Sequence, residues 1–290
     1  MAGVSTATLR RWEVGDVEPS EVVLRGIESL LLNEHSSPAQ TDAATNPHER
    51  LVLATRILVA EGLVGPFGHA SMRSDREGTF LIASRVPADQ VKPQDIVEVE
   101  VGVTPESARK RNLYLEIFIH SCIYQEQSGV QAIMHTHSPY AVALGTMASS
   151  DSRIFPTTNP GANLGSFIPI FHEVGLVESP EKGFRIARAL QGQNGVLLRG
   201  HGAVVVGPSL EQAVLRAIYL EFEARAQIIS RNAGKPIFFT STESKFFGGS
   251  HPNSRATEHA WRYYAEKAQL TGAAGETPRQ HEKLHEKLNS

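Results

Sequence analysis

Residues 129–139 read GVQAIMHTHSP, and this stretch decides how the chain folds. Its first part, from Gly129 to Met134, is short and apolar, which is typical of a strand buried in a sheet. Side chains two residues apart on a strand point to the same face, so His135 and His137 can present both imidazoles to one ion. The strand ends at Pro139, and sheets usually open onto a binding site at strand ends. Taken alone, the pair fits either two metal ligands or two half-exposed polar residues.

A third histidine stands between two glycines in the run Arg199-Gly200-His201-Gly202. The apolar segments 195–198 and 203–206 on either side read as strands. Glycine lets the backbone bend sharply or approach another chain closely while the imidazole projects outward. A tight hairpin with an exposed histidine at its tip is the simpler interpretation of this run. With His135 and His137, however, His201 would complete three imidazoles around an open position, the usual arrangement of a catalytic metal.

Glu116 is the candidate fourth group of this centre. Asn112 could cap a helix in which Glu116, His120 and Tyr124 share one face at i, i+4 and i+8. The Glu116 carboxylate could then bind the metal or move a proton beside it. A solvated helix carboxylate is the commoner fate of a lone glutamate, and only the neighbouring histidines favour the catalytic role.

The chain has 290 residues and divides into four unequal segments. Residues 1–33 are helical in pattern, and residues 34–45 form a polar linker. Residues 46–240 alternate helical and strand-like patterns, as an α/β domain does. Two helix starts are clear, one at Asn46-Pro47 and one at Ser209 with Gln212. Residues 241–290 read as a loop, a short helix over roughly Glu258 to Gln269, and a hydrophilic tail.

Composition excludes several classes of protein. The hydrophobic fraction is 41%, the charged fraction 20% and the net charge −3, so no strong field attracts nucleic acid or an anionic membrane. No apolar run approaches the ~20 residues that span a bilayer, and the first residues lack the features of a secretory signal. Cys122 is the single cysteine, which fits a reducing compartment. We therefore expect a cytoplasmic protein.

These residues, taken in order, resemble the class II aldolase/adducin family over about Asn46 to Pro236. The resemblance is carried by four motifs: Gly68-His69-Ala70-Ser71-Met72-Arg73, Glu116 to Tyr124, His135 to Pro139, and Gly200-His201-Gly202. It implies a three-layer α/β/α sandwich around a mostly antiparallel sheet. It also implies that His135, His137 and His201 bind one divalent metal ion, with Glu116 as ligand or acid/base, and that four copies form a homotetramer with sites near subunit boundaries. Zinc, manganese and iron all accept such ligands.

Departures from the sugar-phosphate aldolase pattern point to a different substrate. Those aldolases typically carry Gly-Asn where this chain has Gly68-His69, and a phosphate-binding Ser-Gly turn where it has Ser84-Arg85. Arginine offers a planar fork suited to a carboxylate. The stretch Tyr114 to Tyr124 and the segment Trp261 to Tyr264 resemble the branch that decarboxylates hydroxypyridine dicarboxylate and dihydroxyphthalate. The resemblance implies a small carboxylate substrate bound by His69, Ser71, Arg85 and Tyr264.

The expected reaction is decarboxylation of a small hydroxylated, aromatic acid through a metal-stabilised enolate. Aldol cleavage passes through the same kind of intermediate, so the motifs do not choose between the two reactions. A non-haem iron oxygenase on the same scaffold is a further alternative. A non-catalytic adducin-like module is another, and retention of all three histidines argues against it.

The N-terminal segment resembles the second half of a phage-repressor-type helix-turn-helix. Ser5 would cap the recognition helix, with Thr6 and Arg10 facing the groove. The partner helix of such a motif is absent, so the segment is either part of a longer DNA-binding domain or a helical appendage. The slight basic character makes nucleic acid an unexpected partner.

Overall fold

The structure is a computed structural model that describes residues 46–147, 153–248 and 255–275. Contacts divide the chain into two units, Met1–Thr45 and Asn46–Ser290. The expectations for the helix-turn-helix segment, the linker and the tail beyond residue 275 lie outside the described residues.

Eight strands form a single sheet in the order β3-β2-β1-β4-β8-β7-β6-β5. Every neighbouring pair is antiparallel except β6 and β7. The expected mostly antiparallel sheet is therefore confirmed. The strands are β1 (His69–Arg73), β2 (Thr79–Ala83), β3 (Ile96–Glu100), β4 (Ala132–Thr136), β5 (Arg153–Ile154), β6 (Ile168–Phe171), β7 (Gly195–Leu198) and β8 (Gly202–Gly207).

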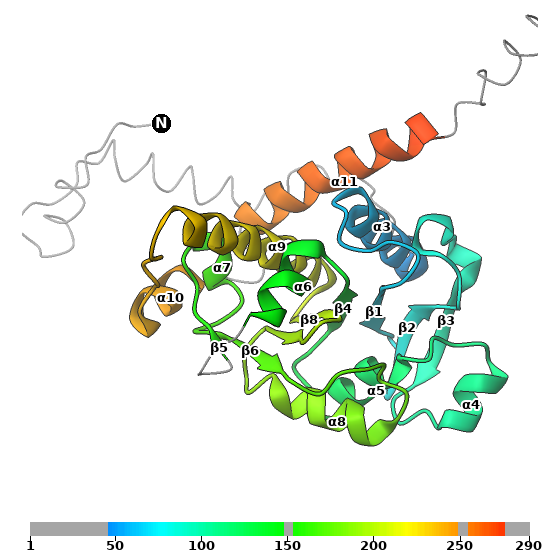
Figure 1. Ribbon diagram of the computed structural model, residues 1–290. Helices are drawn as coiled ribbons and strands as arrows, with labels where there is room; N and C mark the ends of the chain where they lie inside the picture. Colours follow the sequence, from blue (N-terminus) through cyan, green and yellow to red (C-terminus); the bar gives the residue numbers. More distant parts are fainter. Residues whose placement is uncertain (1–45, 148–152, 249–254, 276–290) are drawn as a thin grey trace, which may run out of the picture. The chain divides into compact units, whose positions relative to one another are not determined.

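Helices cover both faces of this sheet, which gives the expected three layers (Figure 1). On one face lie α3 (Pro47–Ala60), α6 (Pro139–Thr146) and α9 (Leu210–Ala233), with α11 (Arg255–Gly275) packed outside α3 and α9. On the other face lie α5 (Ile117–Glu126) and α8 (Pro180–Ala189), which pack against each other. Three short helices, α4 (Pro105–Lys110), α7 (Asn159–Ala162) and α10 (Ser241–Gly248), and two 3-10 turns, Ala88–Gln90 and Pro93–Asp95, join these elements.

The alternation of side chains along β4 decides where the site lies. Ala132 and Met134 pack into the core beneath α3 and α9, whereas Ile133 packs into the core beneath α5. His135 follows with the same parity as Ile133, so it points to the α5 side. The register pairs His135 with His69 of β1, which brings a second imidazole to the same face.

Both expected helix starts are confirmed by their caps. The Asn46 side chain accepts a hydrogen bond from the backbone N–H of His48 at 3.0 Å, and the Ser209 hydroxyl accepts one from that of Gln212 at 3.2 Å. Each cap satisfies one of the backbone donors that a helix start leaves unpaired.

Two expectations about local structure are wrong. The helix that carries His120 begins at Ile117, because Asn112 takes a left-handed conformation (φ 51°) that ends the preceding turn. Glu116 therefore stands just before α5 rather than inside it. The segment after Thr240 is also helical rather than a loop, because Thr240 and Glu243 cap each other reciprocally at its start. None of the described helices is both long and apolar enough to cross a membrane.

Candidate metal centre

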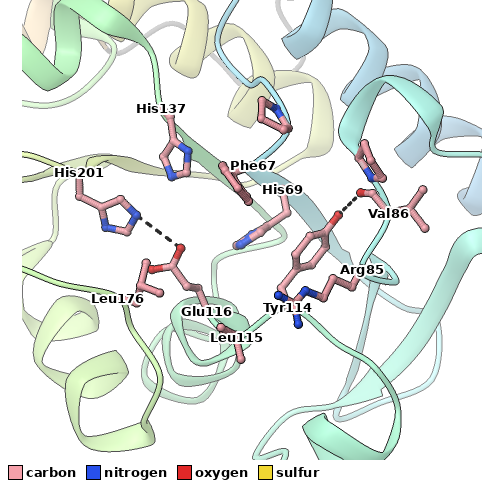
Figure 2. Close-up of a pocket in the computed structure, with 13 residues that line it drawn as sticks. Phe67, His69, Arg85, Val86, Tyr114, Leu115, Glu116, His137, Leu176 and His201 are labelled. Carbon is pink, nitrogen blue, oxygen red and sulfur yellow. Dashed lines mark hydrogen bonds and ion pairs between the residues drawn. The ribbon is translucent and has the colours of Figure 1, made fainter.

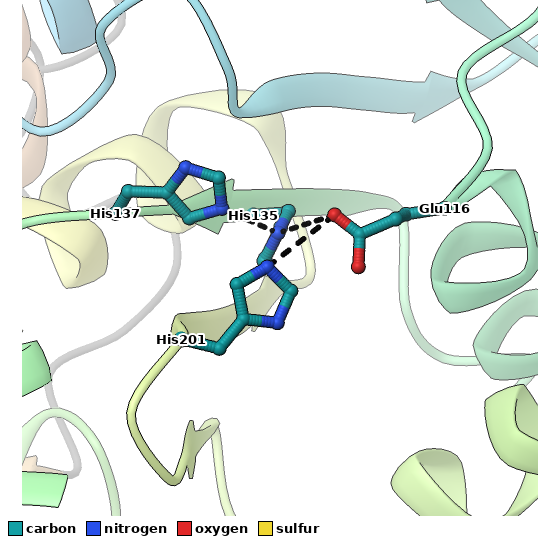
Figure 3. A group of neighbouring side chains, drawn as sticks. All are labelled: Glu116, His135, His137 and His201. Carbon is teal, nitrogen blue, oxygen red and sulfur yellow. Dashed lines mark hydrogen bonds and ion pairs between the residues drawn. The ribbon is translucent and has the colours of Figure 1, made fainter. Parts of the chain in front are cut away.

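Four side chains from three separate parts of the chain converge at the end of β4 (Figure 3). Each of Glu116, His135, His137 and His201 offers one ligand atom, and these atoms lie within 4.8 Å of one another. His135 is on β4, His137 follows it directly, His201 lies in the turn between β7 and β8, and Glu116 precedes α5. The four residues predicted as ligands are thus brought together.

His135 is fully buried, and a hydrogen bond at its Nδ1 fixes the orientation of the ring. Its Nδ1 lies 3.0 Å from the carbonyl oxygen of Ala203 on the neighbouring strand. A carbonyl only accepts, so Nδ1 carries the proton and donates it, which leaves a lone pair on Nε2. That Nε2 lies 3.0 Å from Nε2 of His137 and 3.4 Å from Oε2 of Glu116.

Glu116 presents one carboxylate oxygen to the histidines and anchors the other. Its Oε2 lies 3.4 Å from Nε2 of His201, and its Oε1 accepts a hydrogen bond from the backbone N–H of Val177 at 3.0 Å. Burial by itself raises the pKa of the Glu116 carboxyl, but the contacts with His135 and His201 outweigh burial and hold the pKa well below its usual range. The carboxylate is therefore ionised and oriented.

The four ligand atoms fit a divalent cation. Zinc–nitrogen bonds of ~2.0–2.1 Å in tetrahedral geometry place ligand atoms about 3.3–3.4 Å apart. The two Glu116–histidine distances of 3.4 Å match this spacing, and Nε2 of His135 and Nε2 of His137 lie somewhat closer together, at 3.0 Å. Metal ligands must also be deprotonated. Burial, with smaller effects from His135 and His201, lowers the pKa of His137 to about 4, so that imidazole is neutral near pH 7.

The two glycines around His201 have different roles. Gly200 takes a left-handed conformation (φ 68°) with open space around it, as a sharp turn requires. A Cβ on Gly202 would collide with the carbonyl oxygen of Thr136 and lie 2.8 Å from Cδ2 of His137. One glycine therefore turns the chain, and the other lets β8 approach the end of β4.

A cavity of about 610 Å³ opens beside the four ligands (Figure 2). Its walls are mostly apolar, and Arg85 is exposed on its rim. Within the described part of the chain, the Arg85 guanidinium has no carboxylate partner. The lining residues are Pro66, Phe67, Gly68, His69, Arg85, Val86, Pro87, Tyr114, Leu115, Glu116, His137, Leu176 and His201.

The residues predicted to bind substrate are placed differently from one another. His69 and Arg85 line the cavity together with three of the four predicted ligands, Glu116, His137 and His201. Ser71 is fully buried beneath His69 and does not line the cavity. Tyr264 lies on α11 and packs against the core on the opposite face of the sheet, so this chain does not bring it to the site.

Three further residues shape the site, although the sequence analysis assigned none of them a role there. Tyr114 donates its hydroxyl hydrogen to the carbonyl of Val86 at 2.8 Å, and its ring lies 4.5 Å from that of His69. Burial raises the pKa of Tyr114 to about 12, so it remains a phenol. His120 and Tyr124 lie behind His69, hydrogen-bonded to Ser71. The spacing of His120 and Tyr124 along α5 was the available signal, but it does not reveal which strand they face.

The fold and the site define a class of proteins: a three-layer α/β/α domain with three histidines and one glutamate gathered beside an open cavity. Residues 49–228 match the family described as the Class II Aldolase and Adducin N-terminal domain. This match covers more than half of the chain, and the chain belongs to that family. The family and fold expected from the sequence are confirmed.

Several relatives and solved structures that are similar to this chain carry decarboxylase or aldolase names. The decarboxylase NovR of Streptomyces niveus is 28% identical over 170 residues, which cover 57% of this chain and 62% of NovR. The 3,4-dihydroxyphthalate decarboxylase of Arthrobacter keyseri is 27% identical over 240 residues, which cover 78% of this chain and 94% of that enzyme. The structure of L-fuculose-1-phosphate aldolase from Thermus thermophilus matches this chain with a TM-score of 0.57 and 28% identity. The match covers 66% of this chain and 98% of the aldolase chain.

Proposed function

We propose that this protein is a divalent-metal-dependent carbon–carbon lyase that decarboxylates a small hydroxylated aromatic acid. The observation that carries the proposal is the convergence of Glu116, His135, His137 and His201 at the edge of a largely apolar cavity. The likeness to a 3,4-dihydroxyphthalate decarboxylase over most of both chains supports the same reaction type.

The three histidines would hold the cation and Glu116 would complete its ligands. A divalent cation in this position supplies Lewis-acid stabilisation for the negative charge that develops on a conjugated oxygen when a carbon–carbon bond breaks. Zinc, manganese and iron all accept such ligands, and elemental analysis distinguishes them.

Glu116 would also handle the proton that the reaction requires. Loss of carbon dioxide leaves an electron pair on carbon, and a proton must replace the lost group. Val177 holds Oε1 of Glu116, so Oε2 is the oxygen that faces both the histidines and the cavity. That oxygen is ionised at rest, so it, or a water it holds, would first accept the proton that the substrate hydroxyl loses and then return it to the carbon.

The cavity suits an aromatic carboxylate. The ring of Tyr114 and the side chains of Phe67 and Leu176 give it flat, apolar walls (Figure 2). The Arg85 guanidinium on the rim would bind a carboxylate that is not lost, through paired N–H donors. His69 lies between Arg85 and the ligands and would contact the same substrate.

Elemental analysis of the purified protein, followed by a carbon dioxide release assay, tests the proposal. The assay should use 3,4-dihydroxyphthalate and related hydroxylated dicarboxylates. We expect close to one divalent ion per chain and metal-dependent release. Protein that binds no metal, or that releases no carbon dioxide from any of these acids when loaded, would overturn it.

Aldol cleavage is the second candidate, favoured by the structural likeness to an L-fuculose-1-phosphate aldolase. A panel of sugar phosphates assayed alongside the aromatic acids separates the two reactions. Oxygen consumption by the ferrous protein would instead indicate an oxygenase.

We also propose that the protein acts in the cytoplasm as a homotetramer whose neighbouring copies complete the cavity. Phe67, Leu115 and Leu176 support this assembly, because they line the cavity and yet remain exposed in the single chain. Tyr264 would then be supplied by another copy. Light scattering on the purified protein should give four times the chain mass.

A further inference from the structure

A row of four hydrogen-bonded side chains runs from the cavity into the core beneath it. Nδ1 of His69 lies 2.7 Å from Nε2 of His120, and Nδ1 of His120 lies 2.6 Å from Oγ of Ser71. Oγ of Ser71 lies 2.9 Å from the hydroxyl oxygen of Tyr124. We call these four residues the His69–Tyr124 chain. His69 lines the cavity, whereas the other three are buried and do not.

The backbone explains why these side chains meet. His69 and Ser71 are two residues apart on β1, so both point toward α5. His120 and Tyr124 are four residues apart on α5 and therefore lie one above the other on the helix face that packs against β1. The order of the four residues is thus fixed by one strand and one helix.

The Tyr124 end of the His69–Tyr124 chain is held rigidly in the core. The ring of Tyr124 lies 5.1 Å from that of Phe80, and the guanidinium of Arg73 lies 4.7 Å from the Tyr124 ring centroid. Arg73 is fixed in turn by hydrogen bonds to the carbonyls of Val130 and Tyr124, both at 2.8 Å. The Tyr124 hydroxyl cannot turn away from Ser71 without disturbing these contacts.

The hydrogen bonds of the His69–Tyr124 chain all run in one direction, because a neutral imidazole has one donor nitrogen and one acceptor nitrogen. Both imidazoles are buried, and neither hydrogen-bonds to a carboxylate along the chain, so the neutral form is favoured. Within the described residues, Ser71 is the hydrogen-bond partner of the Tyr124 hydroxyl. A buried hydroxyl hydrogen needs an acceptor, so Tyr124 donates to Ser71.

The positions of the remaining hydrogens follow from this donation by Tyr124. Ser71 has accepted from Tyr124, so its own hydrogen is donated to Nδ1 of His120. His120 must then carry its proton on Nε2 and donate it to Nδ1 of His69. His69 is left with its proton on Nε2, which faces the cavity. The reverse direction would strand the Tyr124 hydrogen without an acceptor, and we expect it to be disfavoured by about tenfold or more.

His69 and His135 are paired across β1 and β4, yet their Nε2 atoms have opposite chemistry. Nδ1 of His135 faces a carbonyl oxygen and must donate, so its Nε2 has a lone pair for a cation. Nδ1 of His69 faces a donor and must accept, so its Nε2 carries a hydrogen. A cation would therefore be bound by the first imidazole and not by the second.

We propose that the His69–Tyr124 chain fixes His69 as an N–H donor at Nε2, which binds an acceptor oxygen of the substrate such as a carboxylate. His120, Ser71 and Tyr124 are then positioning residues that set the tautomer of His69 without touching the substrate. The identity of the bound oxygen rests on the proposed function, whereas the tautomer does not.

Nitrogen NMR on the full chain tests the tautomer directly. Protein labelled with ¹⁵N-histidine and loaded with zinc, which is diamagnetic, gives long-range ¹H–¹⁵N correlations that identify the nitrogen carrying each proton. The His69→Gln variant assigns the His69 signals by their loss. We expect His69 protonated at Nε2 and His135 protonated at Nδ1. His69 protonated at Nδ1 would overturn the proposal, even if the protein proves to be an active decarboxylase.

The Tyr124→Phe variant tests the control exerted from the core. It should release His69 into a mixture of both tautomers and raise KM for 3,4-dihydroxyphthalate by about three- to tenfold. Tyr219→Phe, on the opposite face of the sheet, is the matched control and should change neither quantity. If Tyr124→Phe does not fold, Ser71→Ala breaks the same link. If either variant folds and His69 still shows only the Nε2–H tautomer, the His69–Tyr124 chain does not control that tautomer. Failure to release carbon dioxide with the expected tautomer in place would count against the proposed function alone.

Discussion

Nε2 of His135 and Nε2 of His137 lie 3.0 Å apart and face the same point. Because Nδ1 of His135 donates to the Ala203 carbonyl, the Nε2 of His135 is an acceptor. With no cation between them, His137 would have to donate its Nε2 hydrogen to His135. A cation instead takes both lone pairs at once. Nε2 of His137 therefore either carries a hydrogen or binds the cation, but not both.

The His135→Ala variant should therefore lose metal and activity together. Loss of a second-shell partner already costs about 10–100-fold in metal affinity, and loss of a ligand should cost more. We expect a metal dissociation constant at least ~100-fold higher, measured by competition with a chelator. The exposed His259 on α11 provides the matched control, because His259→Ala removes an imidazole far from the ligands. Full activity in His135→Ala would eliminate the proposed centre.

The free energy of unfolding of the metal-free protein should decrease as the pH falls, because His120 takes up a proton more readily in the unfolded chain than in the folded one. Burial, with a smaller effect from His135, lowers the pKa of His120 from 6.5 to about 3. Between these values the unfolded chain binds a proton that the folded chain does not, so the free energy of unfolding is highest above pH 6.5 and decreases below it. One such proton contributes a slope of ~1.4 kcal/mol per pH unit.

Urea unfolding in EDTA between pH 7 and pH 5 measures this slope. His120→Gln lacks the titrating group, so its slope should be shallower by up to one proton. His259→Gln is the control, and its slope should match that of the parent protein. An unchanged slope in His120→Gln would show that another group carries the acid sensitivity.

The four residues that meet at the candidate metal centre were predictable from the sequence, but the groups that orient them were not. The HxH spacing on a short apolar segment and the histidine between glycines are local patterns, and each has a direct structural cause. The partner of His120 depends on which residue of β1 lies opposite α5, and the register of the sheet decides that. The N–H of Val177 that holds Glu116 comes from an irregular segment whose path no periodicity predicts.

The same distinction explains where the local expectations failed. Asn112 carries a side chain suited to capping, but it also tolerates a left-handed backbone, and the second property decides its conformation here. Tyr264 was linked to the site by its aromatic segment alone. The structure places that segment on the other side of the sheet within one chain.

Gly202→Ala should damage the centre, whereas Gly200→Ala should not. The new methyl group at residue 202 would meet the backbone carbonyl of Thr136, which cannot move without parting β8 from β4. We expect weaker metal binding and a loss of roughly 2–4 kcal/mol in stability. Alanine at residue 200 meets open space and has only the left-handed backbone to oppose it, at a cost of about 1 kcal/mol. Equal metal affinity in the two variants would contradict the close approach.

Glu223 should be a main determinant of stability on the other side of the sheet. It is fully buried on α9, and its carboxylate accepts hydrogen bonds from the backbone N–H groups of Thr157 and Thr158 at 2.8 and 3.1 Å. It also accepts from the Thr157 hydroxyl and from the amide of Gln227, both at 2.8 Å. Removing the carboxylate leaves the part-buried donors of Thr157 and Thr158 without this acceptor, whereas the Gln227 amide keeps the carbonyl of Phe155.

Glu223→Ala should therefore lower the free energy of unfolding by roughly 2–4 kcal/mol and the Tm by about 5–10 °C. The surface residue Glu126, paired with Arg188 at 3.5 Å, is the matched control. Glu126→Ala should cost less than about 1 kcal/mol, because exposed ion pairs contribute little. Calorimetry of the three proteins compares a buried anchor with a surface pair on one scale. A Tm for Glu223→Ala within a degree of that for Glu126→Ala would mean that water replaces the lost acceptor and that the segment from residue 155 to 158 is held by other contacts.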